Sequence, residues 1–284
     1  MEFLQYEFFQ RALLAGLIAA LVCPIIGIFV VVRRQSLIGD GLGHLAFAGV
    51  TGGYLVGLYP AVGALVLTVT GAIGIELMRR RNNQYSDMGL AIFFYAGIAL
   101  AIIFSTMTKM PSSGLLSFLF GSIITVTMAD VIVIAISGVA VAIVVYFLFD
   151  KLMLIAIDED VASVAGINIS LINMIFSIVT AVVVVVGMTI VGILLVSALM
   201  IVPVAGAYLL KLSFKGTLMV AIIISILSVF IGLITSFYLD IAPGGTIVMT
   251  AIGIYVVISL CRKASEFKGR GACGLTTTGD KKND

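Results

Sequence analysis

Long uncharged stretches dominate the chain, and short clusters of charged residues separate them. Residues 12–32, 41–75, 88–108, 110–129, 131–149, 161–210, 216–239 and 241–261 contain no Asp, Glu, Lys or Arg. Each stretch is about as long as one bilayer crossing or longer, because a helix of about 20 apolar residues crosses the hydrocarbon core. Residues 41–75 and 161–210 are long enough for two crossings each. The pattern therefore predicts an all-α, polytopic membrane protein.

The chain has room for nine transmembrane helices. We place them near residues 12–32, 38–58, 61–78, 88–108, 129–149, 171–191, 193–210, 217–238 and 245–262. Eight crossings are the alternative, because Pro203 makes a broken or re-entrant segment compatible with residues 193–210. Residues 1–263 then form one transmembrane domain. Residues 264–284 are rich in Gly, Thr, Lys and Asp, which predicts a disordered cytoplasmic tail.

Positive charges follow alternate predicted spans and indicate the orientation. The cations of these loops are Arg33, Arg34, Arg79, Arg80, Arg81, Lys151, Lys211, Lys215, Arg262, Lys263 and Lys268. Because cytoplasmic loops of membrane proteins are enriched in Lys and Arg, we assign these loops to the cytoplasm. The acidic N-terminus, with Glu2 and Glu7, is then outside and the basic C-terminus inside.

Composition agrees with a membrane protein and excludes several functions. Hydrophobic residues make up 62% of the chain, charged residues 11%, and the mean hydropathy is +1.27. The formal net charge of +2 does not indicate nucleic-acid binding. The sequence lacks His-Glu-x-x-His, Gly-x-Ser-x-Gly and Gly-x-x-x-x-Gly-Lys-Ser/Thr, the motifs of zinc proteases, serine hydrolases and P-loop ATPases. We expect no enzyme, so any ATP-driven step needs a separate polypeptide.

The one histidine of the chain, His44, follows Asp40 by four residues inside an uncharged stretch. This spacing places both side chains on one face of a helix, one turn apart. If that helix starts at Arg34, Asp40 lies roughly 9 Å and His44 roughly 15 Å farther along the axis, deep in the hydrocarbon core. Ionisable groups at that depth are costly and face protein or water. The pair is therefore our candidate metal site, with a structural polar contact as the alternative.

The donor types indicate which cations this pair would take. A carboxylate and an imidazole suit Zn²⁺, Mn²⁺ or Fe²⁺ better than Ca²⁺ or Cu⁺. Two ligands are too few for such ions, so a second copy of the helix or retained water would complete the shell. Small residues around the pair allow close helix packing and predict a central position in the assembly. These residues are Gly39, Gly41, Gly43, Ala46, Ala48, Gly49, Gly52 and Gly53.

Two further polar segments stand out. Residues 158–166 begin with three acidic residues, of which Asp158 can cap a short helix while Glu159 and Asp160 favour its N-terminal end. Gly166 is placed to end this helix, which predicts a cytoplasmic docking element, with a solvated acidic loop as the alternative. On the opposite side, Asp240 precedes Pro243 and two glycines. This pattern is typical of a turn between spans, and Asp240 is also a candidate outer gate.

These residues together resemble the permease subunits of ABC-3 family importers for zinc, manganese or iron. The most specific part is residues 33–44, Arg-Arg-Gln-Ser-Leu-Ile-Gly-Asp-Gly-Leu-Gly-His, followed by Gly49. Residues 119–122 (Leu-Phe-Gly-Ser), 158–166, 195–203 and Asp240 with Pro243 and Gly244 support it. The resemblance covers about residues 8–262. The family usually has Ser and Pro where this chain has Gly43 and Ala48.

The resemblance implies the ABC importer permease fold in a bacterial cytoplasmic membrane. It implies a homodimer that carries two cytoplasmic ATP-binding cassette ATPases and receives metal from an extracytoplasmic binding protein. Asp40 and His44 would be the metal ligands of the pathway, and no cofactor would be bound permanently. The segment from Asp158 to Gly166, including Ala162, would be the coupling helix that docks on the ATPase, which binds the ATP.

Three functions follow as hypotheses. The first is a metal-importing permease that works by alternating access and is driven by a partner ATPase. The alternative is a proton-coupled secondary metal transporter in which Asp40 and His44 relay protons. A structural membrane subunit without cargo is the third. The sequence does not separate zinc from manganese, and we favour zinc.

Overall fold

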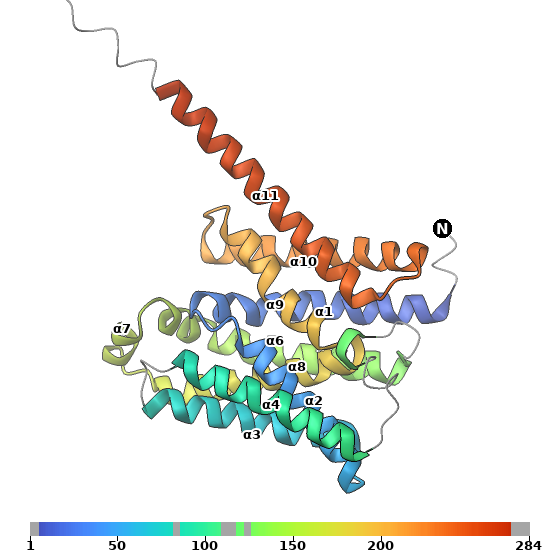
Figure 1. Cartoon of the computed structure of the whole chain (residues 1–284). Helices are drawn as coiled ribbons and strands as arrows, with labels where there is room; N and C mark the ends of the chain where they lie inside the picture. The colour runs from blue at the N-terminus through green and yellow to red at the C-terminus, as the bar shows by residue number, and fades with distance from the viewer. Residues whose placement is uncertain (1–5, 82–85, 109–117, 122–125, 274–284) are drawn as a thin grey trace, which may run out of the picture.

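The computed structural model describes residues 6–81, 86–108, 118–121 and 126–273, and the regular elements within them are helices (Figure 1). The helices are α1 (Glu7–Val32), α2 (Ile38–Val56), α3 (Pro60–Arg81), α4 (Ser86–Thr108), α6 (Met128–Ile157), α7 (Glu159–Val164), α8 (Ile169–Val191), α9 (Ile193–Tyr208), α10 (Phe214–Leu239) and α11 (Pro243–Cys273).

Seven of the described helices are long and apolar enough to cross a membrane, namely α1, α3, α4, α6, α8, α10 and α11. This confirms the all-α, polytopic class. α2 has 19 residues, but its many glycines together with Asp40 and His44 lower its hydropathy below that of the seven. α9 has 16 residues and continues through Pro203, so the proline does not break the helix.

α1 lies at the centre of one half of the molecule, where it packs against α6, α9 and α10. It is the most buried of the seven candidate spans. In Figure 1, the axes of α1, α6, α8 and α10 are nearly parallel or antiparallel, whereas α9 and α11 cross them obliquely. Fully buried side chains of α1 and α9 join these helices in one core, among them Ile26, Phe29, Leu199 and Met200.

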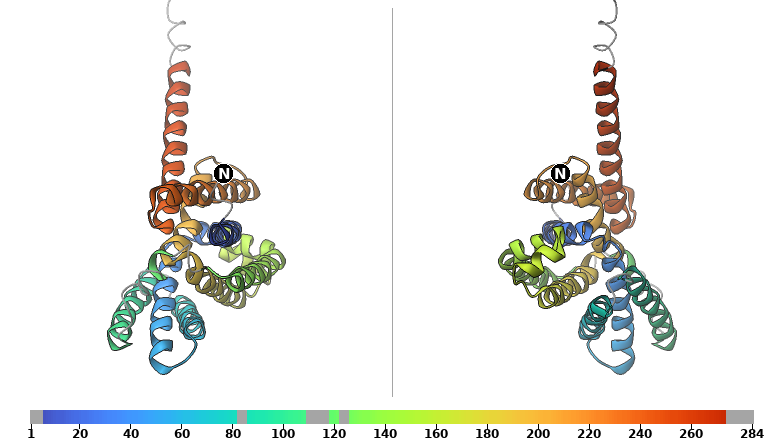
Figure 2. Two further views of the ribbon diagram at one scale, coloured as in Figure 1. Left: turned by 90° about the vertical axis from the view of Figure 1, so that its right-hand side faces the viewer. Right: turned by 90° about the vertical axis from the view of Figure 1, so that its left-hand side faces the viewer.

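α2 lies between α3 and α4, as both views of Figure 2 show. Glycines make the close packing possible, because they leave the backbone uncovered where helices touch. A side chain at Gly49 of α2 would collide with the carbonyl oxygen of Gly63 in α3, and the reverse also holds. The glycine-rich composition of α2 therefore brings backbone against backbone in this half of the fold.

A second glycine contact lies at the end of α8 that is remote from α7. Gly192 links α8 to α9 with φ +89°, and Gly121 has φ +74°, a left-handed conformation that glycine tolerates best. A side chain at Gly192 would collide with the backbone of Gly121, and one at Gly244 would collide with the carbonyl oxygen of Phe120. Three chain segments therefore meet backbone to backbone at this end.

α11 is longer than its predicted span and reaches Cys273. The helix thus includes the first ten residues of the segment 264–284 that was predicted to be disordered. The basic residues Arg262 and Lys263 are compatible with a helix that leaves the apolar layer. Residues 274–284 lie outside the described residues, and the division into a membrane domain and a tail stays a prediction.

Candidate functional site

The turn between α1 and α2 positions the candidate metal ligands. Arg33 caps α1, Arg34 adopts a left-handed conformation (φ 57°), and the Gln35 amide donates to the carbonyl oxygen of Val30 at 2.9 Å. α2 then begins at Ile38 rather than at Arg34. Asp40 therefore lies in the first turn of α2, and its calculated depth from Arg34 along one continuous helix was wrong, because the turn interrupts that helix.

Asp40 and His44 lie on the least covered side of α2, which we call its open stripe. Every residue from Ile38 to Gly53 is buried except Asp40, His44 and Gly52, which are half-buried, and Asp40 and His44 share one face. The remaining faces pack against α3, α4, α8 and α9. The fold therefore places these two polar side chains on the side of α2 that its own chain covers least.

Neighbouring helices restrict how these side chains lie. The His44 imidazole stands edge-on to the Phe94 ring of α4, with the ring centroids 5.0 Å apart. Gly97 of α4 faces the backbone and Cβ of His44, so that α4 approaches α2 closely at this level. On another face of α2, a Cβ at Gly43 would lie 2.6 Å from Cγ2 of Ile193, so the close approach of Ile193 favours glycine at this position.

The two side chains form no hydrogen bond or ion pair with each other within the described residues. The structural alternative, in which they satisfy each other, therefore has no direct contact to support it. The described part of the chain also contains no group of three or more His, Cys, Asp or Glu side chains suited to one metal ion. Asp40 and His44 can supply two ligands of a coordination shell, one oxygen and one nitrogen.

The acidic segment after α6 forms the predicted short helix, α7. The Asp158 carboxylate accepts hydrogen bonds from the amides of Asp160 (2.9 Å) and Val161 (3.1 Å), and so caps the helix. Gly166 has φ +78° and ends the turn, with its amide bonded to the carbonyl oxygen of Ser163. Ala162 is fully buried, whereas Val164 is 91% exposed. One side of α7 therefore packs against the helix bundle, and the opposite side is exposed.

Asp240 caps the C-terminal end of α10 in a left-handed conformation (φ 52°) and is exposed. The turn that follows is closed by the Ser236 hydroxyl, which donates to the carbonyl oxygen of Ile241 at 2.5 Å. α11 starts at Pro243 directly afterwards. The predicted turn is therefore present, while the role of Asp240 as an outer gate stays a prediction.

Sequence reasoning missed polar residues that the fold buries near these segments. Glu76 is 3% exposed and Asn173 is 2% exposed, and both belong to a polar cluster beside α7. The spacing of three residues between Glu76 and Arg79 was a signal for an ion pair, but their distant partners were not visible in the sequence. Ser197 of α9 faces Gly39, and its buried hydroxyl has no hydrogen-bond partner among the described residues.

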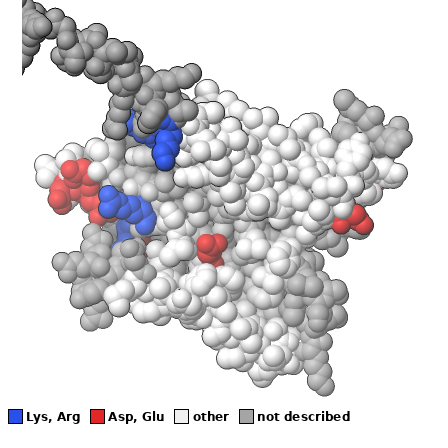
Figure 3. Space-filling view, turned by 45° about the horizontal axis from the view of Figure 1, so that its top comes forward, with Lys and Arg blue, Asp and Glu red and all other residues white. Residues whose placement is uncertain are grey.

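Charge is distributed unevenly over the surface. Figure 3 shows Lys and Arg gathered toward one end of the visible face, next to a group of acidic side chains, while most of the remaining face is uncharged. Further acidic side chains lie near the middle and toward the opposite end of this face. A largely uncharged surface with its cations gathered at one end is the distribution expected of a protein that spans a bilayer. The fold and the site together define a membrane-embedded transport subunit with a polar pair on an inner helix.

The chain belongs to the ABC 3 transport family, whose model matches residues 5–262. It is 34% identical over 264 residues to a probable metal transport system membrane protein of Treponema pallidum, covering 90% of this chain and 97% of that protein. It is 30% identical to the high-affinity zinc uptake system membrane protein ZnuB of Haemophilus influenzae, covering 89% and 97%.

A solved structure supports the same assignment. PsaBC from Streptococcus pneumoniae in complex with Fab has a TM-score of 0.80 and 28% sequence identity, and the match covers 90% of this chain and 94% of that chain. The resemblance drawn from the sequence is thus confirmed. The protein is a multi-pass membrane permease subunit of a bacterial ATP-binding cassette importer of metal ions, and is not itself an ATPase.

Proposed function

We propose that this permease imports a divalent transition metal, zinc or manganese, and that Asp40 and His44 are its ligands within the pathway. The observation that carries the proposal is the placement of both residues on the half-buried open stripe of α2, whose N-terminal two thirds are otherwise almost fully buried. Their oxygen and nitrogen donors suit these ions, and iron as Fe²⁺ is the third candidate. The zinc uptake function named for ZnuB of Haemophilus influenzae agrees with this range.

A second copy of the chain completes the site in this proposal. An ionisable pair that faced lipid would be costly, so the open stripe needs protein or water against it. In a two-fold dimer the same patch of both copies meets at the axis, which brings two aspartates and two histidines together. Four ligands from two chains, with water, would satisfy a transition metal while leaving the shell open enough for release.

The topology of the proposal has nine crossings, with α2 and α9 added to the seven apolar helices. α2 tolerates its polar residues because most of the helix is buried in protein, and α9, with 16 residues, packs against α1, α10 and α11. α7 then lies on the cytoplasmic side, where Asp158, Glu159, Asp160, Ala162 and Gly166 form or support the surface that docks the ATPase. The turn at Asp240 lies outside, where an extracytoplasmic binding protein delivers the metal.

Transport into proteoliposomes tests the proposal. The permease is reconstituted with its ATPase and binding protein, and ATP-dependent uptake of ⁶⁵Zn²⁺ and of ⁵⁴Mn²⁺ is measured for Asp40→Ala and His44→Ala. We expect uptake to fall by at least about tenfold in both variants, because each removes one ligand donor type. Asp150→Asn, an exposed carboxylate at the end of α6, is the matched control and retains uptake.

The same assay separates the proposal from its alternatives. Uptake that follows a proton gradient without ATP would identify a secondary transporter. Unchanged uptake in both variants, with the complex intact on size-exclusion chromatography, would remove Asp40 and His44 from the pathway. The ratio of zinc to manganese transported decides the cargo.

A further inference from the structure

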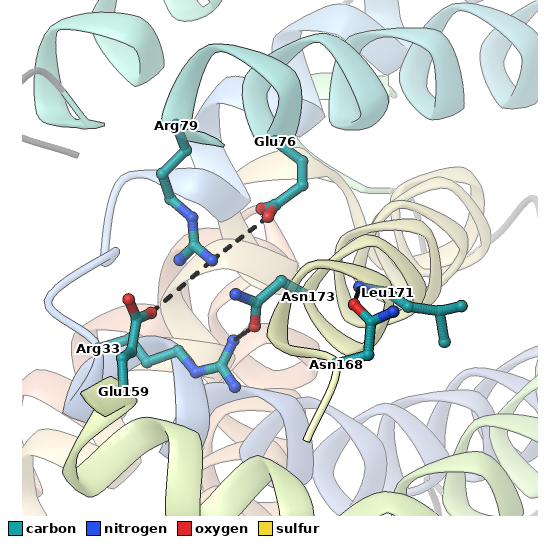
Figure 4. A network of polar contacts seen from close by, with 7 residues as sticks. All are labelled: Arg33, Glu76, Arg79, Glu159, Asn168, Leu171 and Asn173. Carbon is teal, nitrogen blue, oxygen red and sulfur yellow. Dashed lines mark hydrogen bonds and ion pairs between the residues drawn. The ribbon is translucent and has the colours of Figure 1, made fainter. Parts of the chain in front are cut away.

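A cluster of polar side chains joins four helices at the end of the molecule that carries α7 (Figure 4). We define the Arg33 cluster as Arg33 at the end of α1, Glu76 and Arg79 of α3, Glu159 of α7 and Asn173 of α8. These residues lie far apart in the sequence, and the fold alone brings them together. None of them belongs to the candidate metal pair.

Arg33 is held in place by α8. Its Nη1 donates to Oδ1 of Asn173 at 2.7 Å, and its guanidinium carbon lies 5.0 Å from the centroid of the Phe176 ring. Asn173 is 2% exposed and Phe176 is 3% exposed, so this contact is shielded from water. Arg33 is thus fixed by one hydrogen bond and one ring face, in surroundings where a charge is costly.

Arg79 lies between two carboxylates on different helices (Figure 4). It donates to Oε1 of Glu76 at 3.3 Å, three residues earlier in α3, and lies 3.9 Å from Oε1 of Glu159 in α7. The Glu76 side chain is buried, whereas that of Glu159 is 40% exposed. The contact between α3 and α7 is therefore the longer and more accessible of the two, and the easier one to break.

Arg33 has unused hydrogen-bond donors. Its Nε and Nη2 are buried and have no hydrogen-bond partner among the described residues. Burial, together with the nearby Arg79, lowers the pKa of Arg33 to about 10, and Glu159 and Glu76 partly oppose this shift. The guanidinium stays charged at neutral pH, and two carboxylates lie close enough to act on it. Arg33 is thus a buried cation with unused N–H groups, and the carboxylate of Glu159, which is only weakly held by Arg79, could pair with it instead.

Arg33 is also linked directly to the candidate metal helix. It caps α1, and the left-handed Arg34 and the buried Gln35 lead from it into α2. The Ile38 amide, at the start of α2, donates to the carbonyl oxygen of Gln35 at 2.9 Å. A shift of Arg33 is therefore passed through a short, hydrogen-bonded turn to the first turn of α2, which contains Asp40.

We propose that the Arg33 cluster transmits the movement of α7 to the metal-binding helix. When the ATPase displaces α7, Glu159 leaves Arg79 and pairs with the unused N–H groups of Arg33, and the turn before α2 shifts with them. Glu159 and Arg33 are positioning residues in this scheme, since neither touches the metal. The inference rests on the proposed docking of α7 on the ATPase.

The ratio of metal imported to ATP hydrolysed tests this inference. It is measured in proteoliposomes that contain the complete complex with Arg33→Lys, Glu159→Gln or both changes. Lysine keeps the charge of Arg33 but lacks the forked donors, and Glu159 is accessible enough for glutamine to be tolerated. We expect the ratio to fall about five- to tenfold in each single variant, as loss of a coupling contact implies. Lys151→Gln, an exposed cation of α6 outside both the cluster and the turn before α2, is the control and keeps the wild-type ratio.

The double variant shows whether the two residues act together. If Glu159 works through Arg33, the double variant loses no more than either single variant, whereas independent effects multiply. Multiplied losses, or wild-type ratios in the single variants, overturn the inference. A fall in hydrolysis and uptake in parallel, with the ATPase lost from the purified complex, also overturns it, because the cluster would then serve docking alone.

A separate experiment shows whether the proposed docking of α7 on the ATPase fails, independently of the Arg33 cluster. If scrambling residues 158–166 leaves the ATPase bound, α7 is not the docking element, whatever the ratio in the Arg33 cluster variants.

Discussion

At the residue scale, glycine decides where the polar side chains of α2 can lie. Gly39, Gly43 and Gly49 each face another helix so closely that a side chain would meet atoms of Ser197, Ile193 and Gly63. Asp40 and His44, by contrast, are only half-buried, although Phe94 of α4 packs against the His44 ring. The sequence identified this pair because charge in an apolar stretch is rare, but it did not show which face remains uncovered.

Replacing Gly49 with alanine tests the importance of close helix packing. We expect Gly49→Ala to destabilise the permease by about 1–3 kcal/mol, because its Cβ would collide with backbone atoms of α3 that cannot move independently. The midpoint of thermal unfolding in detergent is the measurement. Gly253→Ala is the matched control, since a Cβ there meets open space in the middle of α11 and alanine favours helix. Equal midpoints for the two variants would contradict the packing argument.

At the element scale, the sequence predicted α7 and placed the start of the second span at residue 38, where α2 begins, but it did not reveal the left-handed turn at Arg34. A capping aspartate, two acidic residues and a terminal glycine are contained within residues 158–166, and the structure confirms the helix. The start of α2 depends on Arg34, which adopts a left-handed conformation that arginine rarely takes. Nothing in the neighbouring sequence marks this left-handed conformation.

The cap of α7 can be removed selectively. Asp158→Ala should destabilise α7 by about 1 kcal/mol, because two backbone amides lose their acceptor. Hydrogen exchange of the amides in residues 159–164 should become faster, and less ATPase should purify with the permease if α7 is the docking element. Asp158→Asn retains an acceptor and should exchange like the wild type. Slow exchange in the alanine variant would show that tertiary contacts, rather than the cap, hold α7.

At the scale of the whole molecule, a single chain does not explain why two ionisable side chains lie half-buried on the open stripe of α2. The described residues supply only two metal ligands at this place. A second copy placed against the stripe would supply two more and remove the ionisable pair from lipid. The proposed site would therefore become complete only in the proposed homodimer.

Mixed dimers test this requirement. Wild-type and His44→Ala permeases are co-expressed in equal amounts with different affinity tags, and ATP-driven metal uptake is measured for the mixture. If each site needs a histidine from both copies, only pairs of two wild-type chains transport, and uptake falls to about one quarter of the wild-type value. A fall to one half would mean that each chain carries its own complete site.

The sequence alone determined the class of this protein, because hydropathy, the positions of cations and rare polar residues are properties of the chain itself. It also indicated Asp40, His44 and the short helix α7, whose signals lie within a few neighbouring residues. The Arg33 cluster was decided only by the tertiary structure, since Arg33 and Asn173 are 140 positions apart and their contact arises from packing of α1 against α8. The open stripe of α2 likewise depends on which faces its neighbours cover, and that is a property of the assembled fold.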